Sequence, residues 1–404
     1  MTEDLKRLGK TLTVNYAMIQ SVIIMGYCSI FSFASVFLLS RGFTNSQVGL
    51  TLTLSCAAAL FFQPLAAAFA DQTRRFSLRS IVSFMLGLVS FFGLILYLTP
   101  AVFLPTAILY ILLVLVFSTP VTLVTSMSME HINKGVPINF SLARGIGSFA
   151  FAILSFLLGY LVEEFGAGVV MLVNIVLGFA GVILVSTFKK ANKQNSSLTD
   201  SEDAAAGLLE FAQQNKRFLA VIASIALLFF SHVLINTYSI QIVENVGGSS
   251  ADMGIGVAIA GLLELPAMAM FPLIYKKLQN AGLLMKIAAG FFIVKTLITL
   301  LAPNVFWFDV AQCFQFFAYA MFTPASVFYV NEVIRDADNN KGQAIMGMTM
   351  GISGLIANFF GGYILDTSGG VTMMLIIGIL VSFAGFLMLI FIDKSKPFIR
   401  RVDQ

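Results

Sequence analysis

Residues 156–166 read FLLGYLVEEFG, and residues 359–369 read FFGGYILDTSG. A shift of 203 positions superimposes the two segments and places an acidic residue over an acidic residue. The identical positions are Phe156, Gly159, Tyr160 and Gly166 over Phe359, Gly362, Tyr363 and Gly369. A second match, SQVGL (46–50) over ADMGI (251–255), has nearly the same offset, 205. Two matches at almost one spacing indicate that the chain consists of two repeated halves.

Each half contains six apolar runs of membrane-spanning length. The 404 residues are 58% hydrophobic and 11% charged, with a mean hydropathy of +0.92, whereas soluble domains carry about 25% charged residues. A spanning helix needs about 20 mostly apolar residues. The expected spans are 13–39, 46–70, 78–99, 103–128, 141–163, 167–188, 218–242, 252–275, 284–302, 307–330, 343–365 and 371–392.

These runs predict an all-α polytopic membrane protein with twelve transmembrane helices in two pseudo-symmetric six-helix bundles. We expect the bundles to comprise residues 1–188 and 218–404. The polar stretch 189–217 then forms a cytoplasmic linker between them, because it is rich in Lys, Ser, Asn and Asp. Its last part has the pattern of an amphipathic helix at the membrane face.

The basic residues are distributed very unevenly between the two sides of the predicted membrane. Of the 24 Lys and Arg residues, 22 lie on one side if the N-terminus is cytoplasmic. Such an excess is typical of cytoplasmic loops, so we expect a multi-pass protein of the cell (plasma or inner) membrane with both termini in the cytoplasm. The first run, 13–39, is too long for the apolar region of a cleaved signal peptide.

Several functional classes are disfavoured by what the sequence lacks. No basic cluster is interleaved with aromatic residues, so no nucleic-acid partner is expected. The three cysteines, Cys28, Cys56 and Cys313, lie in apolar runs without metal-ligand spacing, and no metal site is predicted. The two histidines have no acid at catalytic spacing, and no GxxxxGK[ST] loop is present. We therefore expect neither an enzyme nor an ATP-driven pump.

Parallel repeats of six helices are the construction of the major facilitator superfamily of transporters, which this chain resembles. That family's loop between its second and third helices usually reads G-x-x-x-D-[RK]-x-G-[RK]-[RK]. Here the segment is AAFADQTRRF (67–76), in which Asp71 and Arg75 keep their places. The resemblance implies that they form a conformational latch. A solvated inner loop is the alternative.

The segment NFSLARGIGSFAFA (139–152) is similar to F-G-x-A-R-x-x-G-x-x-G-[WF]-A of the lactose permease and oligosaccharide–proton symporter group. The resemblance implies that Arg144 binds sugar hydroxyls and that Phe151 stacks on the sugar ring. Seven residues are two helical turns, so both side chains share a helix face. The alternative is an Arg144 that extends to the membrane surface.

The chain also departs from that group. The partner carboxylate on the fourth helix falls on Ser126, although Glu130 lies one turn further on. The tenth-helix His and Glu that couple the proton fall on Tyr319 and Phe322. The resemblance therefore leaves both the sugar and the proton-carrying group open.

Charged residues within the spans of the second half are candidates for function, because burying an ion in the membrane costs several kcal/mol. Glu264 and Lys295 lie at similar depth on consecutive predicted helices, as a substrate- or proton-linked pair or as a neutralising ion pair. Glu264 is the first candidate proton carrier and His232 the second, with hydrogen-bonded packing as the alternative for the histidine. Further candidates for substrate binding follow His232 in the seventh helix: Asn236, Tyr238 and Gln241.

Helix interruptions are expected around a central site. Prolines lie inside several predicted spans, and each removes a backbone hydrogen bond. These prolines are Pro64, Pro120, Pro266, Pro272 and Pro324.

Together these features predict a monomeric secondary transporter for a small sugar or oligosaccharide, working by alternating access. The resemblance implies coupling to a proton gradient, with a sodium gradient as the alternative, and no bound cofactor. An exporter of sugars or drugs, or an importer of nucleosides or aromatic acids, is the alternative.

Overall fold

The computed structural model describes residues 3–73, 76–132, 134–189, 210–335 and 338–393. Within these ranges the chain is helical almost throughout and contains no strand. Twelve segments of this described part are long and apolar enough to cross a membrane. The predicted all-α polytopic fold is therefore confirmed.

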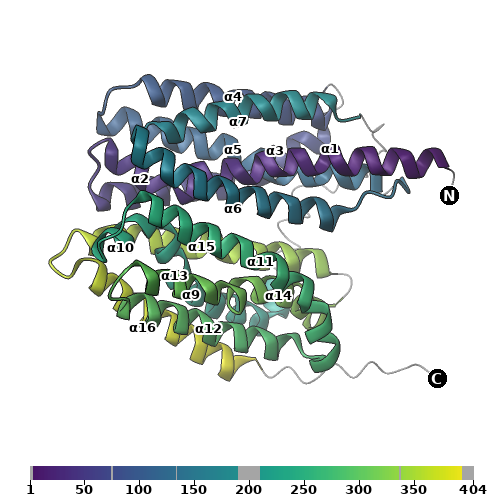
Figure 1. Cartoon of the computed structure of the whole chain (residues 1–404). Coiled ribbons are helices and arrows are strands. Elements are labelled where there is room, and N and C mark those ends of the chain that lie inside the picture. Colours follow the sequence, from purple (N-terminus) through teal and green to yellow (C-terminus); the bar gives the residue numbers. More distant parts are fainter. Residues whose placement is uncertain (1–2, 74–75, 133, 190–209, 336–337, 394–404) are drawn as a thin grey trace. The chain divides into compact units, whose positions relative to one another are not determined.

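The helices fall into two compact units. Figure 1 draws most of the first unit in purple to teal and most of the second in green to yellow. The first unit contains α1 (Glu3–Tyr27), η1 (Cys28–Ser32), α2 (Ala34–Ser40), α3 (Asn45–Gln72), α4 (Leu78–Leu98), α5 (Phe103–Ile132), α6 (Phe140–Phe165) and α7 (Val169–Thr187). The second contains α9 (Lys216–Thr237), α10 (Ser239–Asn245), α12 (Ala281–Leu301), α13 (Val305–Cys313), η2 (Phe314–Phe316), α14 (Tyr319–Val333), α15 (Asn339–Leu365) and α16 (Gly370–Ile392).

One helix is divided between the units. In α11 (Ser250–Leu278) the residues up to Gly261 belong to the first unit, and those from Leu262 onward belong to the second. The domain boundaries predicted at 188 and 218 stay predictions. Most of the predicted linker, residues 190–209, lies outside the described residues.

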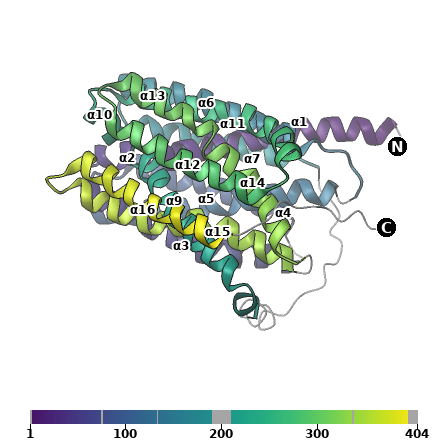
Figure 2. The same ribbon diagram turned by 90° about the horizontal axis from the view of Figure 1, so that it is seen from below.

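The two units are built as repeats of one bundle. In the first, α1 packs against α6 and α7, and α4 packs against α5 and α7. In the second, α9 packs against α15 and α16, and α12 packs against α14 and α16, as Figure 2 shows from below. Each unit has its own apolar core. The twofold repetition read from the sequence is thus present in the packing.

The repetition extends to single hydrogen bonds at helix ends. Arg79 at the start of α4 donates to the carbonyl oxygens of Ser186 and Phe188 at the end of α7, both at 3.0 Å. Lys286 near the start of α12 donates to the carbonyl oxygen of Asp393 after α16, at 2.8 Å. In both units a cation therefore satisfies carbonyl groups that a helix end leaves open.

Three predicted spans are broken in the structure. The first breaks at Phe33 (φ −100°, ψ 13°), after a π-helical turn, and the seventh breaks at Tyr238 (φ −107°, ψ 29°). These positions are 205 residues apart, the offset that relates the repeats. The tenth breaks between η2 and α14, where Ala318 has φ −84° and ψ −100°.

None of these breaks occurs at a proline, so the prolines do not mark the helix interruptions that were expected around a central site. All five lie inside continuous α-helices, α3, α5, α11 and α14. Within a membrane helix, neighbouring groups compensate for the hydrogen bond that a proline removes. A proline alone therefore does not mark where these helices end.

In the first unit the backbones of α6 and α11 touch. A Cβ atom added to Gly254 would lie 2.5 Å from the carbonyl oxygen of Ser155, and one added to Gly159 would lie 2.7 Å from that of Ser250. Beyond this crossing, the Ser249 hydroxyl donates to Glu163 at 2.9 Å. Only glycine allows helices to approach so closely, so the repeated Gly159 has a packing role.

Candidate functional site

A buried lysine is the centre of the polar cluster in the second unit. Lys295 lies in the middle of α12 and is 1% exposed. Its Nζ donates a hydrogen bond to Oε1 of Gln315, at 2.8 Å. An ammonium group removed from water is tolerated only with such compensation. The environment of Gln315 therefore determines which other groups are linked to Lys295.

Gln315 joins Lys295 to Glu264. It lies in η2, where the tenth span is broken, and its Nε2 donates to Oε1 of Glu264 at 3.3 Å. Glu264 is half-buried in the part of α11 that belongs to the second unit. The predicted pairing of Glu264 with Lys295 is thus mediated by an amide that comes from a third helix.

Aromatic rings enclose the second predicted ionisable group, His232 of α9. Its ring stacks on Tyr319, with centroids 4.9 Å apart and planes 11° apart. Phe292 of α12 lies edge-on at 5.3 Å. His232 is 2% exposed, and its Nδ1 has no hydrogen-bond partner among the described residues. Because the Asn236 amide donates to Nε2, Nδ1 carries the proton of the neutral ring and is a buried donor without an acceptor in the described part of the chain.

The aromatic group and the polar group are adjacent. Phe292 and Lys295 are one helical turn apart on α12, so they share a face. Lys295 also acts electrostatically on both His232 and Glu264. The second unit thus brings together three sequence-predicted residues on three different helices.

The other seventh-helix candidates have different surroundings. Asn236 hydrogen-bonds Nε2 of His232 through its Nδ2, at 3.0 Å. Tyr238 is fully buried, and its hydroxyl donates to the carbonyl oxygen of Asn358 in α15. Gln241 is buried in α10. Asn236 therefore belongs to the cluster, whereas Tyr238 holds α9 against α15.

The candidates from the fifth predicted span belong to the first unit. Arg144 is exposed in the second turn of α6. Phe151 is half-buried and packs against Gly261, where an added Cβ atom would lie 2.9 Å from its Cδ1. Their substrate contacts stay a prediction.

The predicted latch falls at the end of α3 and in the segment that follows it. Asp71 lies within α3, but its side chain and the whole of Arg75 lie outside the described residues. The latch therefore stays a prediction too. Among the residues that are described, no group of three or more His, Cys, Asp and Glu side chains could hold a metal ion.

Sequence reasoning missed Gln315. Ionisable residues within the spans stood out from the sequence, and a glutamine carries no charge. A usable signal was nevertheless present, because Gln315 lies in the apolar run CFQFFAYAMF (313–322). A polar amide in such surroundings must find hydrogen-bond partners. Tyr319 was also missed as a stacking partner, although the family resemblance had drawn attention to that position.

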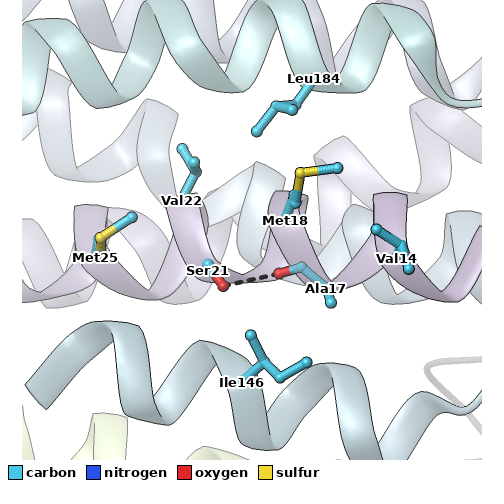
Figure 3. A pocket seen from close by; sticks show the side chains of 8 residues that line it. All are labelled: Val14, Ala17, Met18, Ser21, Val22, Met25, Ile146 and Leu184. Atoms are coloured by element: carbon cyan, nitrogen blue, oxygen red, sulfur yellow. Dashed lines mark hydrogen bonds between the residues drawn. The ribbon is translucent and has the colours of Figure 1, made fainter. Parts of the chain in front are cut away.

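The first unit also has an open apolar groove of about 380 Å³ between α1, α6 and α7, which Figure 3 shows from close by. Its one hydroxyl, that of Ser21, donates to the carbonyl oxygen of Ala17 in the same helix at 2.8 Å. None of the predicted site residues lines it. The lining residues are Val14, Ala17, Met18, Ser21, Val22, Met25, Ile146 and Leu184.

Two repeated six-helix bundles, with polar and ionisable side chains buried within membrane spans, define a polytopic membrane transporter of the major facilitator fold. The chain belongs to the MFS_1 like family, whose model matches residues 25–376. A protein of Bacillus subtilis (strain 168), described as uncharacterized transporter YwbF, is 25% identical over 377 residues, which are 92% of this chain and 91% of that protein.

Solved structures of transporters have the same fold. A mutant form of the nucleoside transporter NupG superimposes with a TM-score of 0.82 at 15% identity, covering 95% of this chain and all of that one. A D-xylose-proton symporter superimposes with a TM-score of 0.70 at 14% identity, covering 96% of this chain and 97% of that one. At these identities the comparison shows the fold alone.

Proposed function

We propose that the chain imports a small sugar-containing solute, either a free sugar or oligosaccharide or a nucleoside, by proton-coupled symport with alternating access. The observation that carries the proposal is the joined cluster of the second unit, in which Glu264, Gln315 and Lys295 lie beside the stacked rings of His232 and Tyr319. We expect the protein to act as a monomer in the cell membrane, with both termini cytoplasmic.

The chemistry of the cluster suits such a solute. Hydroxyl groups both donate and accept hydrogen bonds, and the cluster offers a carboxylate, an amide and an ammonium group within one bonded chain. Aromatic faces stack on the apolar face of a sugar or on a nucleobase. The names of two proteins of similar fold, a nucleoside transporter and a D-xylose-proton symporter, support the same solute class.

For proton coupling we propose Glu264 as the carrier and His232 as the second candidate. An intramembrane carboxyl can bind and release a proton when its neighbours change. Glu264 is half-buried and bonded to a neutral amide, so both protonation states can be accommodated. From the first unit we propose Arg144 and Phe151 as further substrate contacts, and Asp71 and Arg75 as the latch.

The test is uptake by purified protein in liposomes under an imposed pH gradient, acidic outside. The solutes are radiolabelled D-xylose, lactose and uridine. Accumulation of a saccharide identifies a sugar transporter, and accumulation of uridine alone identifies a nucleoside transporter. If none accumulates above the level without a gradient, the proposal is wrong.

Two variants make the test specific for the cluster. Lys295→Gln is expected to abolish accumulation, because the ammonium group is lost from the bonded chain. Lys277→Gln is the matched control, since Lys277 lies exposed in the last turn of α11 and should transport like the wild type. Equal accumulation by both variants would contradict the assignment of the site.

A further inference from the structure

The orientation of the Gln315 amide follows from its two partners. An ammonium group only donates, so Lys295 must face the amide oxygen. The amide nitrogen then faces Glu264, whose oxygen accepts. A reversed amide would place a donor against a donor. The direction of both hydrogen bonds is therefore fixed by chemistry rather than by an assignment of similar atoms.

Gln315 also lies next to the break of the tenth span. It lies in the single 3₁₀ turn η2, and α14 begins only after Ala318, whose φ and ψ of −84° and −100° are not helical. Ordinary helical hydrogen bonding is interrupted at this point, and local breaks of this kind often act as hinges. The amide that joins Glu264 to Lys295 is thus mounted at the break of the tenth span.

Protonation of Glu264 would change this arrangement directly. Hydrogen bonds to an ionised carboxylate are stronger than those to a neutral group, so the bond from Nε2 weakens when a proton binds. The new O–H group is a donor, and it competes with Lys295 for an acceptor. Among the described residues, the groups that contact or lie near Glu264 and Gln315 include Lys295 from α12, His232 from α9 and Tyr319 from the broken tenth span.

We propose that Gln315 is the positioning residue that transmits the protonation state of Glu264 to Lys295 and to the break between η2 and α14. With Glu264 ionised, the amide bonds both neighbours and holds the break in the observed shape. With Glu264 protonated, the amide is held more weakly by the carboxyl and the tenth span can rearrange at Ala318. This inference rests on the proposed proton coupling, and it assigns to an uncharged residue the link between proton and conformation.

The experiment compares two transport activities of the protein in liposomes, solute exchange and solute accumulation. Exchange of labelled for unlabelled solute at equal pH needs no net proton movement, whereas accumulation under a pH gradient does. Gln315→Leu removes both hydrogen bonds and is expected to keep exchange within about twofold of the wild type while accumulation falls about tenfold or more. The pH profile of exchange should flatten, because Glu264 no longer acts through the amide.

A second variant tests whether Gln315 acts through its bond to Glu264 or only accepts a hydrogen bond from Lys295. Gln315→Glu still accepts from Lys295, but it cannot donate to an ionised Glu264. If Gln315 only compensates Lys295, Gln315→Glu should accumulate solute like the wild type, and the inference is overturned. If the bond to Glu264 matters, accumulation should be lost although the melting temperature is kept.

The matched control is Gln312→Leu. Gln312 is 3% exposed on α13, three residues before Gln315, so it tests the effect of a buried leucine in the same span. It should retain accumulation. Equal losses in Gln312→Leu and Gln315→Leu would overturn the inference, whereas absence of accumulation in the wild type would instead overturn the proposed function.

Discussion

The rings of His232 and Tyr319 lie face to face, with centroids 4.9 Å apart and planes 11° apart. The two residues come from α9 and from the first position of α14. Tyr319 occupies the place where the lactose permease group is expected to have a proton-coupling residue. An aromatic ring therefore occupies the position at which the family resemblance implies an ionisable side chain.

Replacing Tyr319 should affect the solute more than the fold. Tyr319→Leu removes the stacked ring and is expected to raise KM for the transported solute about 2- to 10-fold, the range that one aromatic contact supports. Tyr319→Phe keeps the ring and should stay within about twofold of the wild type. Initial uptake rates at several solute concentrations measure this. A KM increase in Tyr319→Phe as large as that in Tyr319→Leu would assign the role to the hydroxyl instead.

Lys295 and Glu264 should behave as coupled residues in stability. Lys295→Met leaves the Gln315 oxygen without its donor and is expected to lower the free energy of unfolding by about 1–3 kcal/mol. Adding Glu264→Gln should restore part of this loss, because no charge then remains in the pair. Thermal melting of the purified single and double variants gives the coupling. Strictly additive effects would show that Gln315 does not connect the two residues.

The two glycines at the crossing of α6 and α11 should not tolerate larger side chains. Gly254→Val drives its Cβ toward the Ser155 carbonyl oxygen, which lies 2.5 Å from that position. Overpacking of this kind costs about 1–3 kcal/mol, so a lower melting temperature is expected. Gly87→Val is the control, since nothing lies within 4 Å of a Cβ atom at that helical glycine. Equal melting temperatures would argue against a tight crossing.

The ion pair between Lys286 and Asp393 should contribute more than an exposed pair. Its Nζ–Oδ2 distance is 2.8 Å, and the Asp393 side chain is 3% exposed. Lys286→Met leaves that carboxylate buried without its cation, and a loss of about 3–5 kcal/mol is expected. The more accessible pair Lys341 and Asp338, with side chains 40% and 25% exposed, provides the comparison, because Lys341→Met should cost about 0–1 kcal/mol. Chemical denaturation in detergent measures the free energy of unfolding of both variants. Equal losses in Lys286→Met and Lys341→Met would show that Asp393 is solvated.

The ends of most spans could be predicted within a few residues because apolar length is a local property. The predicted spans 78–99 and 371–392 are found as Leu78–Leu98 and Gly370–Ile392. The breaks within spans could not be placed by the same reasoning. They occur at Phe33, Tyr238 and Ala318, where the residue type carries no breaking signal, and the prolines that carry one lie inside continuous helices.

The sequence was sufficient to predict the ionisable residues of the candidate site, but not the hydrogen bonds that join them. Glu264, Lys295 and His232 stand out because ionisable groups are costly in a bilayer. Tyr238 was also predicted as a site residue, yet its hydroxyl donates to the carbonyl oxygen of Asn358 and serves packing. Which polar side chain serves packing depends on the rotation of each helix about its axis, and hydropathy does not encode that rotation.

The sequence by itself determined a membrane protein of twelve spans in two repeats, because the length of apolar runs and their repetition can be read directly from the residues. Only the tertiary structure decided that one uncharged amide, Gln315, connects Glu264 with Lys295. The physical reason is that the three residues come from separate helices, and their distances depend on how those helices pack and where the tenth span breaks.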